Sequence, residues 1–152
     1  MGANVVAIDI NDSTLEVCKA QGADVVFNSR TDPEYVSKIK ELTKGGVHAA
    51  AVFSNAQIAY ANAPSIIRVG GTLMVVGITG KPIEVSTMAL ALGAYNLKSE
   101  STSIPQRMKK AVDFSAKHEI APEVEIRTLD ELDSMVKEMR AGTATKRMAV
   151  TF

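Results

Sequence analysis

Residues 4–12 constrain the fold of this chain more than any other stretch. They open with a continuous apolar run that ends at Asp9 and is followed by turn-forming residues. Such a run is typical of a strand buried on both faces, as in a parallel sheet. Ligands bind at the carboxyl edge of open parallel sheets, where Asp9 could accept hydrogen bonds from both hydroxyls of an adenosine ribose. The alternative is a surface aspartate that begins a turn.

The charge at this position also bears on the type of nucleotide. A carboxylate at Asp9 would repel the 2′-phosphate of NADP, and no arginine follows before Arg30. An arginine near the ribose is what usually accommodates that phosphate. The stretch therefore favours NAD over NADP.

The rest of the chain alternates between strand and helix patterns. Strands are predicted at residues 4–9, 25–27, 49–53, 72–76, 81–85, 95–99, 124–127 and 148–152. Helices are predicted at residues 13–21, 33–42, 56–68, 87–93, 106–117 and 129–142. Pro82 makes the segment 81–85 an edge strand, because proline cannot donate to an interior ladder. Strands that alternate with helices of this length predict a parallel α/β sheet.

Several helix ends carry specific signals. The stretches 13–16 and 128–131 match the capping-box pattern and each predict a helix start. Asp32 followed by Pro33 predicts an N-cap and a first helical position. The glycines at 70–71 are expected to end the helix that begins at residue 56.

Composition sets the outer limits. The chain has 152 residues, of which 46% are hydrophobic and 22% charged, and its formal net charge is zero. These values are typical of one soluble globular domain. No basic run favours nucleic acid, and no apolar stretch approaches the ~20 residues that span a bilayer. We therefore expect no nucleic-acid or membrane partner.

Cysteine and histidine usage points to a compartment and argues against a metal. The single Cys18 excludes an internal disulfide and favours a reducing, cytoplasmic location. With two histidines and one cysteine in the whole chain, a structural zinc site of the usual ligand types is not expected.

Six stretches, taken together and in order, resemble the coenzyme-binding half of zinc-type alcohol dehydrogenases. These enzymes belong to the medium-chain dehydrogenase/reductase superfamily, and the resemblance covers essentially all 152 residues. No single stretch is specific, but the ordered set is. The stretches lie at residues 2–11, 21–24, 45–48, 69–77, 109–114 and 140–147.

The resemblance implies nine residues that bind the coenzyme NAD. They are Asp9, Ile10 and Asn11 at the adenosine end, Phe53 and Ser54 beside the ribose and nicotinamide, Val76, Gly77 and Ile78 at the carboxamide, and Arg147 near the pyrophosphate. Each has a structural alternative, namely a core side chain, a turn or an ordinary surface charge. A multi-donor cation such as Arg147 suits a pyrophosphate well.

Departures from the family pattern define the expected fold class. The family's domain begins with a strand and a Gly-x-Gly-x-x-Gly turn, and this sequence contains no such motif. The catalytic zinc domain is also absent. We therefore expect an α/β fold, an incomplete doubly wound, Rossmann-like parallel sheet that lacks the first strand and first helix. Residues 1–152 would form a single truncated dinucleotide-binding-like domain in which NAD binding is weak or lost.

A missing first strand would leave a gap between the strands at 4–9 and 49–53, which flank it in the 3-2-1-4-5-6 order. Each orphaned backbone group would cost about 1–3 kcal/mol if buried. We expect either direct pairing of these two strands or a dimer that covers the exposed faces. The resemblance implies dimerisation through residues 95–100, to which the apolar stretch 88–92 could add.

Three classes of function remain open. In the first, the chain is part of an NAD-dependent oxidoreductase and has little activity alone. In the second, it is a repurposed, cofactor-independent isomerase, lyase or cyclase that acts on a small apolar metabolite. In the third, it is a non-catalytic dimeric binding protein. Its partners would be a nucleotide or small-molecule substrate and a second copy. For the second class the candidate acid–base groups are Lys98, Glu100, His48 and His118. Their structural alternative is solvated surface.

Overall fold

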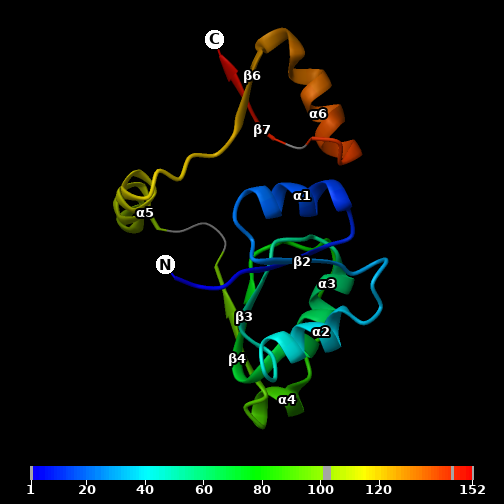
Figure 1. The fold of residues 1–152 in the computed structure, drawn as a ribbon. Helices are drawn as coiled ribbons and strands as arrows, with labels where there is room; N and C mark the ends of the chain where they lie inside the picture. The colour runs from blue at the N-terminus through cyan, green and yellow to red at the C-terminus, as the bar shows by residue number, and fades with distance from the viewer. Residues whose placement is uncertain (1, 101–103, 145, 152) are drawn as a thin grey trace. The chain divides into compact units, whose positions relative to one another are not determined.

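The computed structural model describes residues 2–100, 104–144 and 146–151. The chain divides into two compact units, residues 1–102 and residues 103–152. The expected single truncated domain stays a prediction. Each unit contains parallel strands connected through helices (Figure 1). The expected α/β class with parallel, Rossmann-like sheets is confirmed.

The first unit contains two separate parallel sheets. Strands β1 (Val6–Asp9) and β2 (Val25–Asn28) form a two-stranded sheet, in which Asp9 lies opposite Asn28. Strands β3 (Val47–Val52), β4 (Ile67–Val75) and β5 (Tyr95–Ser99) form a second sheet in the order β3-β4-β5. All pairings within both sheets are parallel, so the carboxyl ends of neighbouring strands lie at the same edge.

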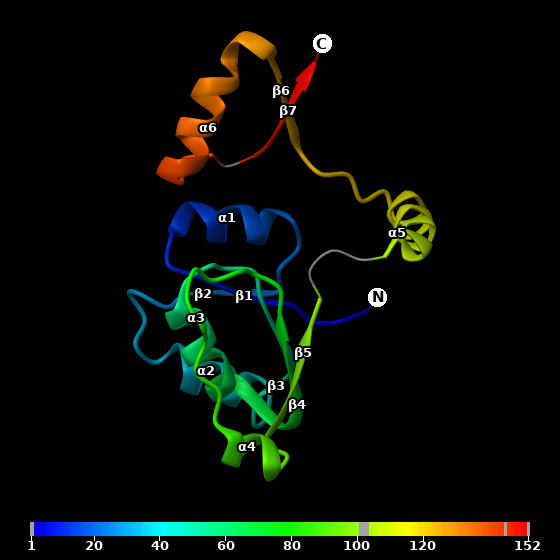
Figure 2. The same cartoon turned by 180° about the vertical axis from the view of Figure 1, so that it is seen from behind.

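The helices of this unit lie on both sides of the β1–β2 sheet. Helix α1 (Asp12–Ala20) lies on one side, and α2 (Tyr35–Leu42) and α3 (Gln57–Asn62) lie on the other, as the two opposite views show (Figures 1 and 2). A 3-10 turn, η1 (Ala63–Ile66), follows α3, and α4 (Thr87–Ala91) precedes β5.

One hydrophobic core serves both sheets of the first unit. Ile39 of α2 is fully buried, and Tyr60 of α3 and Leu73 of β4 are buried beside it. From the other sheet, Val6 and Ile8 of β1 pack against the same cluster. The two sheets therefore lie over the same helices, and burial of this apolar surface is what stabilises the unit.

The second unit is built on a parallel pair of strands. It contains α5 (Pro105–Lys117), β6 (Val124–Thr128), η2 (Leu129–Glu131), α6 (Leu132–Ala141) and β7 (Arg147–Thr151), with β6 paired to β7. The predicted capping box at 128–131 is confirmed by both of its reciprocal hydrogen bonds.

An ion pair and a glycine complete the second unit. The Arg127 guanidinium donates to both carboxylate oxygens of Glu138 at 2.9 and 3.0 Å, which ties β6 to α6. Both Glu138 and Glu125 raise the pKa of Arg127 through these charge-assisted hydrogen bonds. Helix α6 ends at Gly142, whose φ of 69° is the left-handed C-cap that glycine adopts without strain.

Two predicted helix starts are wrong by one to two residues. Helix α1 begins at Asp12 with Asn11 as its N-cap, not at the predicted capping box. Helix α2 begins at Tyr35, because Asp32 instead accepts the Glu34 N–H at 3.0 Å and closes a turn before the helix. Side chains of this type compete with the helix for backbone donors.

The prediction of a helix over residues 56–68 is wrong at its carboxyl end. Ile67 begins β4, so Arg68 and the glycines at 70–71 lie within a strand. The ladder is irregular there: Val47 pairs with Ile67, but Ala49 pairs with Thr72. Gly70, with a φ of 75°, takes the left-handed conformation within this irregular stretch, which glycine adopts without strain.

The predicted edge strand at 81–85 is also absent, since those residues are in no strand of the structure. Pro82 is held by a side chain, because the Gln57 amide donates to its carbonyl at 2.6 Å.

Direct closure of the gap is contradicted. Within the described residues, β1 pairs with β2 alone and β3 pairs with β4 alone, so no ladder joins β1 to β3. Both strands still cover the same core, which explains why the unit is compact without that ladder. The dimer alternative stays a prediction. No helix in the described part of the chain is long and apolar enough to cross a bilayer.

Candidate functional site

Asp9 is the last residue of β1, and its carboxylate is held by the backbone that follows. Its Oδ1 accepts the N–H groups of Ile10 at 2.7 Å and Asn11 at 2.9 Å. The Asp9 Oδ2 accepts no hydrogen bond from the described residues. One oxygen therefore orients the group while the other is open to a ligand at the carboxyl edge of the sheet. Asn11 then caps α1 without a side-chain bond, so its amide is also available.

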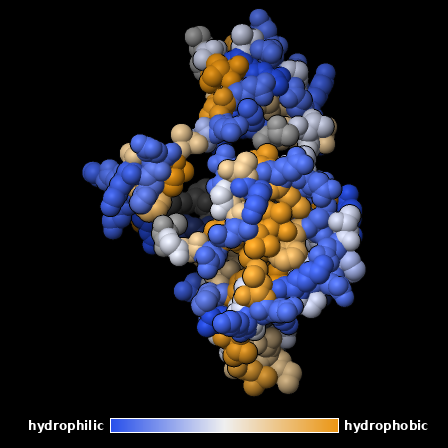
Figure 3. Space-filling model, viewed as in Figure 1, coloured by the Kyte–Doolittle hydropathy of each residue, from blue (hydrophilic) through white to orange (hydrophobic). Residues whose placement is uncertain are grey.

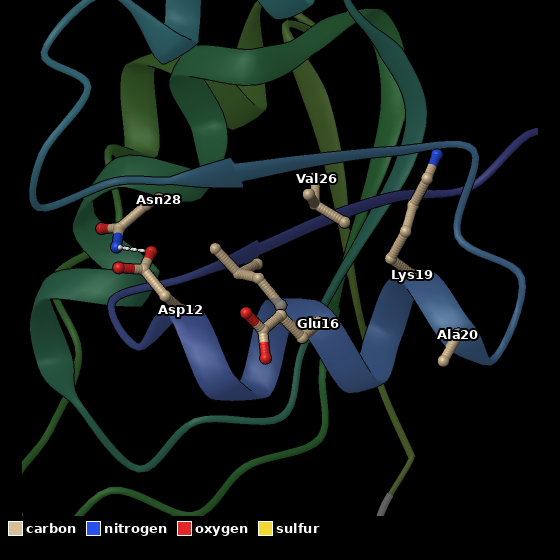
Figure 4. Close-up of a pocket in the computed structure, with 7 residues that line it drawn as sticks. Asp12, Glu16, Lys19, Ala20, Val26 and Asn28 are labelled. Carbon is tan, nitrogen blue, oxygen red and sulfur yellow. Dashed lines mark hydrogen bonds between the residues drawn. The ribbon is translucent and has the colours of Figure 1, made fainter.

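Asn28 is a residue that sequence reasoning missed at this edge. It ends β2 directly opposite Asp9, and its Nδ2 donates to Asp12 Oδ1 at 2.6 Å. Figure 4 shows this bond at one end of an open hollow between α1 and β2. The signal was present: an apolar run at 25–27 stops at a polar residue, as the first run stops at Asp9.

The carboxyl ends of β3 and β4 meet in a second cluster of predicted residues. The N–H groups of Val76 and Gly77 both donate to the Val52 carbonyl, at 3.2 and 2.8 Å. Gly77 lies so close to the neighbouring chain that an added Cβ would be 2.7 Å from the carbonyl carbon of Phe53. A glycine is required there by close approach of two backbones.

Tyr60 of α3 connects the two strand ends of this cluster and was not predicted as a site residue. Its ring is 3% exposed, and its hydroxyl hydrogen-bonds to the carbonyls of Gly77 and Val52. No sequence motif identifies this tyrosine, because its partners come from two different strand ends. A buried Tyr hydroxyl usually finds such a partner.

A shallow apolar hollow opens at the carboxyl end of β4. Val76, Gly77 and Ile78, predicted to contact the nicotinamide, all line it. Phe53 and Ile78 are 77% and 78% exposed, although they are large and apolar. The remaining lining residues are Tyr60, Val75, Thr79, Gly80, Lys81, Pro82, Ile83 and Ser99.

The side chain of Ser54, which was predicted to lie beside the coenzyme, is engaged by the backbone. Its hydroxyl accepts the Ala56 N–H at 3.0 Å, which closes the turn between β3 and α3.

The candidate acid–base residues are dispersed. Lys98 pairs with Met74, and Ser99 pairs with Val75. Because successive side chains of a strand alternate between faces, Lys98 lies on the face opposite the one where Ser99 lines the hollow. Glu100 follows β5, and its N–H donates to the Val75 carbonyl at 3.1 Å.

The two histidines belong to different units. His48 is near the amino end of β3, where its Nε2 contacts the Arg68 guanidinium. His118 caps α5 in the second unit, with its ring 4.4 Å from that of Phe114. Arg147 also belongs to the second unit, where it is exposed at the start of β7.

Electrostatics do not single out an acid or base at these strand ends. The shifted groups in the first unit are an ion pair at the surface: Lys38 Nζ lies 2.8 Å from Asp32 Oδ2, which lowers the pKa of Asp32 and raises that of Lys38. This pair fastens the turn before α2. It plays no part in the candidate site.

The described residues do not fit a zinc ion. No three of their His, Cys, Asp and Glu side chains gather closely enough to hold a metal. The donor set that zinc requires, three or four such ligands in tetrahedral geometry, is therefore not formed by this part of the chain.

Several solved structures with the same fold are alcohol dehydrogenases. The enzyme from the archaeon Aeropyrum pernix matches with a TM-score of 0.82 and 26% identity over 96% of this chain and 42% of its own. Benzyl alcohol dehydrogenase from Acinetobacter calcoaceticus matches with a TM-score of 0.81 and 24% identity, over 98% of this chain and 43% of its own. An alcohol dehydrogenase from Thermotoga maritima matches with a TM-score of 0.82 and 19% identity, over 98% and 44%.

These matches cover nearly all of the chain and less than half of each relative, so the chain spans well under two thirds of their length. A family model described as zinc-binding dehydrogenase matches residues 1–117, which include β1 to β5 and α5. The ordered motifs of the sequence, the parallel sheets and this match agree, and the chain belongs to the zinc-binding dehydrogenase family.

Proposed function

We propose that this chain forms the coenzyme-binding part of an NAD-dependent, alcohol-dehydrogenase-type oxidoreductase. The observation that carries the proposal is the Asp9 carboxylate. Two backbone N–H groups orient one of its oxygens, and the other is open at the carboxyl end of β1. A carboxylate so placed accepts ribose hydroxyls and repels a 2′-phosphate. In this proposal Ile10 and Asn11 flank the adenine.

The hollow at the end of β4 supports the nicotinamide half of the proposal. Its lining by Val76, Gly77 and Ile78 provides backbone groups beside an apolar surface, which suits a flat aromatic amide. Phe53 is exposed at the neighbouring strand end. The pyrophosphate would need donors that the described carboxyl edges do not supply, so we expect weak binding by this chain alone.

Hydride transfer would then belong to a larger enzyme. The described residues form no zinc cluster, and the chain spans less than half of its relatives. We expect dehydrogenase turnover by residues 1–152 alone to be at or near background with simple alcohols. The position of Lys98 does not support the alternative of a cofactor-independent acid–base enzyme, because Lys98 lies on the face of β5 away from the hollow.

The test is a calorimetric titration of the chain with NADH and with NADPH. We expect NADH to bind and Asp9→Ala to weaken it about 10- to 100-fold, because hydrogen bonds to a charged group contribute about 1.5–3 kcal/mol. NADPH should bind more weakly than NADH to the parent chain, and Asp9→Ala should narrow that difference. Glu41→Gln, which removes an exposed carboxylate on α2, is the matched control and should change neither affinity.

Two results would contradict the proposal. One is a parent chain that binds no NADH at millimolar concentration. The other is an Asp9→Ala variant that binds NADH as tightly as the parent.

We also propose that the chain forms a homodimer through β5. Within the described residues β5 pairs only with β4, so its outer edge is open. Helix α4 beside it and the C-cap of that helix expose Met88 and Leu92 at 72% and 74%, and Figure 3 shows apolar surface over this helix. Sedimentation velocity should find a dimer that Leu92→Lys dissociates, while Ile58→Lys on α3 leaves it intact. A parent chain that sediments as a monomer at a concentration of about 100 μM would exclude this dimer.

A further inference from the structure

The side-chain amide of Asn28 joins two segments that are far apart in the sequence. Its Nδ2 donates to Asp12 Oδ1 at 2.6 Å and lies 3.4 Å from the carbonyl oxygen of Ile10. Its Oδ1 accepts the N–H groups of Arg30 at 2.9 Å and Thr31 at 3.3 Å. Figure 4 shows the bond to Asp12, which connects the end of β2 to the start of α1. One amide therefore holds the turn before α1 against the loop that follows β2.

This turn is the one that orients Asp9. The N–H groups of Ile10 and Asn11 donate to Asp9 Oδ1 at 2.7 and 2.9 Å, so the direction of the carboxylate depends on the position of these two residues. The backbone of Asp9 is held separately, because its carbonyl accepts the Ser29 N–H at 3.0 Å. Strand pairing therefore sets where Asp9 lies, and the turn sets where its carboxylate points.

No side-chain cap fastens this turn locally. Asn11 is the N-cap of α1, but its side chain makes no capping hydrogen bond. A side-chain cap ordinarily satisfies one of the first N–H groups of a helix and so fixes the helix start. Here the first residue of the helix, Asp12, is instead bonded to Asn28, which lies 16 positions away in the sequence. A hydrogen bond to an ionised carboxylate is stronger than one between neutral groups. This long-range bond therefore takes the place of a local cap.

We propose that Asn28 is a positioning residue of the nucleotide site: through Asp12 it holds the turn that directs the Asp9 carboxylate toward a ribose. The inference rests on the proposed function for its ligand, a nucleotide with free ribose hydroxyls. Asn28 acts through Asp12 and the turn and needs no contact with the nucleotide. Without the amide, the turn and the carboxylate have to be ordered when the nucleotide binds, and ordering of this kind weakens affinity about three- to tenfold.

The test reverses the two partners of the hydrogen bond. Asn28→Asp places a second carboxylate against Asp12, so repulsion replaces the hydrogen bond. The swapped pair, Asn28→Asp together with Asp12→Asn, restores one amide and one carboxylate with donor and acceptor reversed, and it keeps the net charge of the parent. Asn28→Ala removes the bond without adding a charge. Glu16→Gln is the matched control, because Glu16 lines the same hollow but makes no hydrogen bond to the described residues.

Hydrogen exchange followed by NMR, without nucleotide, measures the turn directly. We expect Asn28→Asp and Asn28→Ala to lower the protection of the Ile10 and Asn11 amides about tenfold. The amide of Leu73, which is buried in β4, should keep its protection and so show that the unit stays folded. The swapped pair should recover protection at both amides, and Glu16→Gln should leave it unchanged.

Calorimetric titration with NADH measures the consequence for binding. We expect both single variants of Asn28 to bind about three- to tenfold more weakly than the parent, and the swapped pair to bind nearly as tightly as the parent. A residue that only stabilised the fold would change the protection of Leu73 and would leave the NADH affinity of the folded chain unchanged.

Three results would overturn the proposal. Unchanged protection of Ile10 and Asn11 in both single variants means that Asn28 does not hold the turn. Lost protection that the swapped pair does not recover means that the bond to Asp12 is not what holds it. NADH affinity that equals that of the parent in both single variants means that the turn does not direct Asp9. If the parent chain itself binds no NADH, the proposed function fails, and the hydrogen exchange alone then decides whether Asn28 positions Asp9.

Discussion

The hydroxyl of Tyr60 joins the ends of two strands at the proposed nicotinamide site, and removing it tests how the site is held. In Tyr60→Phe the ring, which is 3% exposed, keeps its packing, and only the hydroxyl is lost. That hydroxyl has one proton, so it donates to one carbonyl at a time, of Gly77 or of Val52.

The expected cost follows from what each carbonyl retains. The Val52 carbonyl still accepts two N–H groups at 3.2 and 2.8 Å, so it is not left unsatisfied. The Gly77 carbonyl loses its side-chain partner but lies at an open hollow, where water can replace it. The net loss is therefore that of one ordinary hydrogen bond, about 1 kcal/mol, rather than the larger penalty of a buried orphan. Because the first unit has only about 100 residues, its Tm should fall by about 4–8 °C.

Tyrosine fluorescence during urea unfolding measures this change cleanly. The chain has three tyrosines and no tryptophan, and Tyr35, Tyr60 and Tyr95 all belong to the first unit. Tyr35→Phe is the matched control, since Tyr35 is buried and its hydroxyl has no hydrogen bond to the described residues. If Tyr60→Phe and Tyr35→Phe were equally stable, the hydroxyl would not hold the strand ends. A loss above about 3 kcal/mol would show that water does not reach the Gly77 carbonyl.

Two further predictions concern backbone approach and pH. Gly77→Ala should destabilise the first unit by about 1–3 kcal/mol through overpacking against Phe53, measured by the same unfolding. Gly80→Ala, with nothing near its added Cβ, should cost less; equal costs would refute the close-approach argument. The Thr128 N–H and hydroxyl lower the pKa of Glu131. Its contribution to stability is therefore present above the ordinary pKa that the glutamate has in the unfolded chain, and it is lost as pH falls through the lower folded pKa. Hydrogen exchange of α6 should show this loss, and Glu131→Gln, which keeps the cap, should remove it; an unchanged profile in that variant would assign the loss to other groups.

Local signals predicted most elements of this chain. The apolar runs predicted as strands at 4–9 and 49–53, the capping box at 128–131 and the glycine at Gly142 all mark elements of the structure. These features depend on neighbours within a few residues, so sequence alone carries them. The order of motifs likewise identified the dehydrogenase family, which the family match over residues 1–117 confirms.

The errors arose where residues distant in sequence compete. Residues after Ile66 have a helical pattern, but pairing with β3 and the positive φ of Gly70 make them a strand. The sequence predicts a strand at residues 81–85, but this segment pairs with no strand of the described residues. The Gln57 side chain hydrogen-bonds to it instead.

The candidate site divides in the same way. Sequence placed Asp9 and Gly77 at strand ends, because each follows directly from an apolar run. Only the tertiary structure showed Asn28 opposite Asp9, Tyr60 beneath Gly77 and Lys98 on the wrong face for the hollow. It also decided that, among the described residues, β1 and β3 belong to two separate sheets, because strand pairing depends on how segments distant in the sequence pack around the shared core.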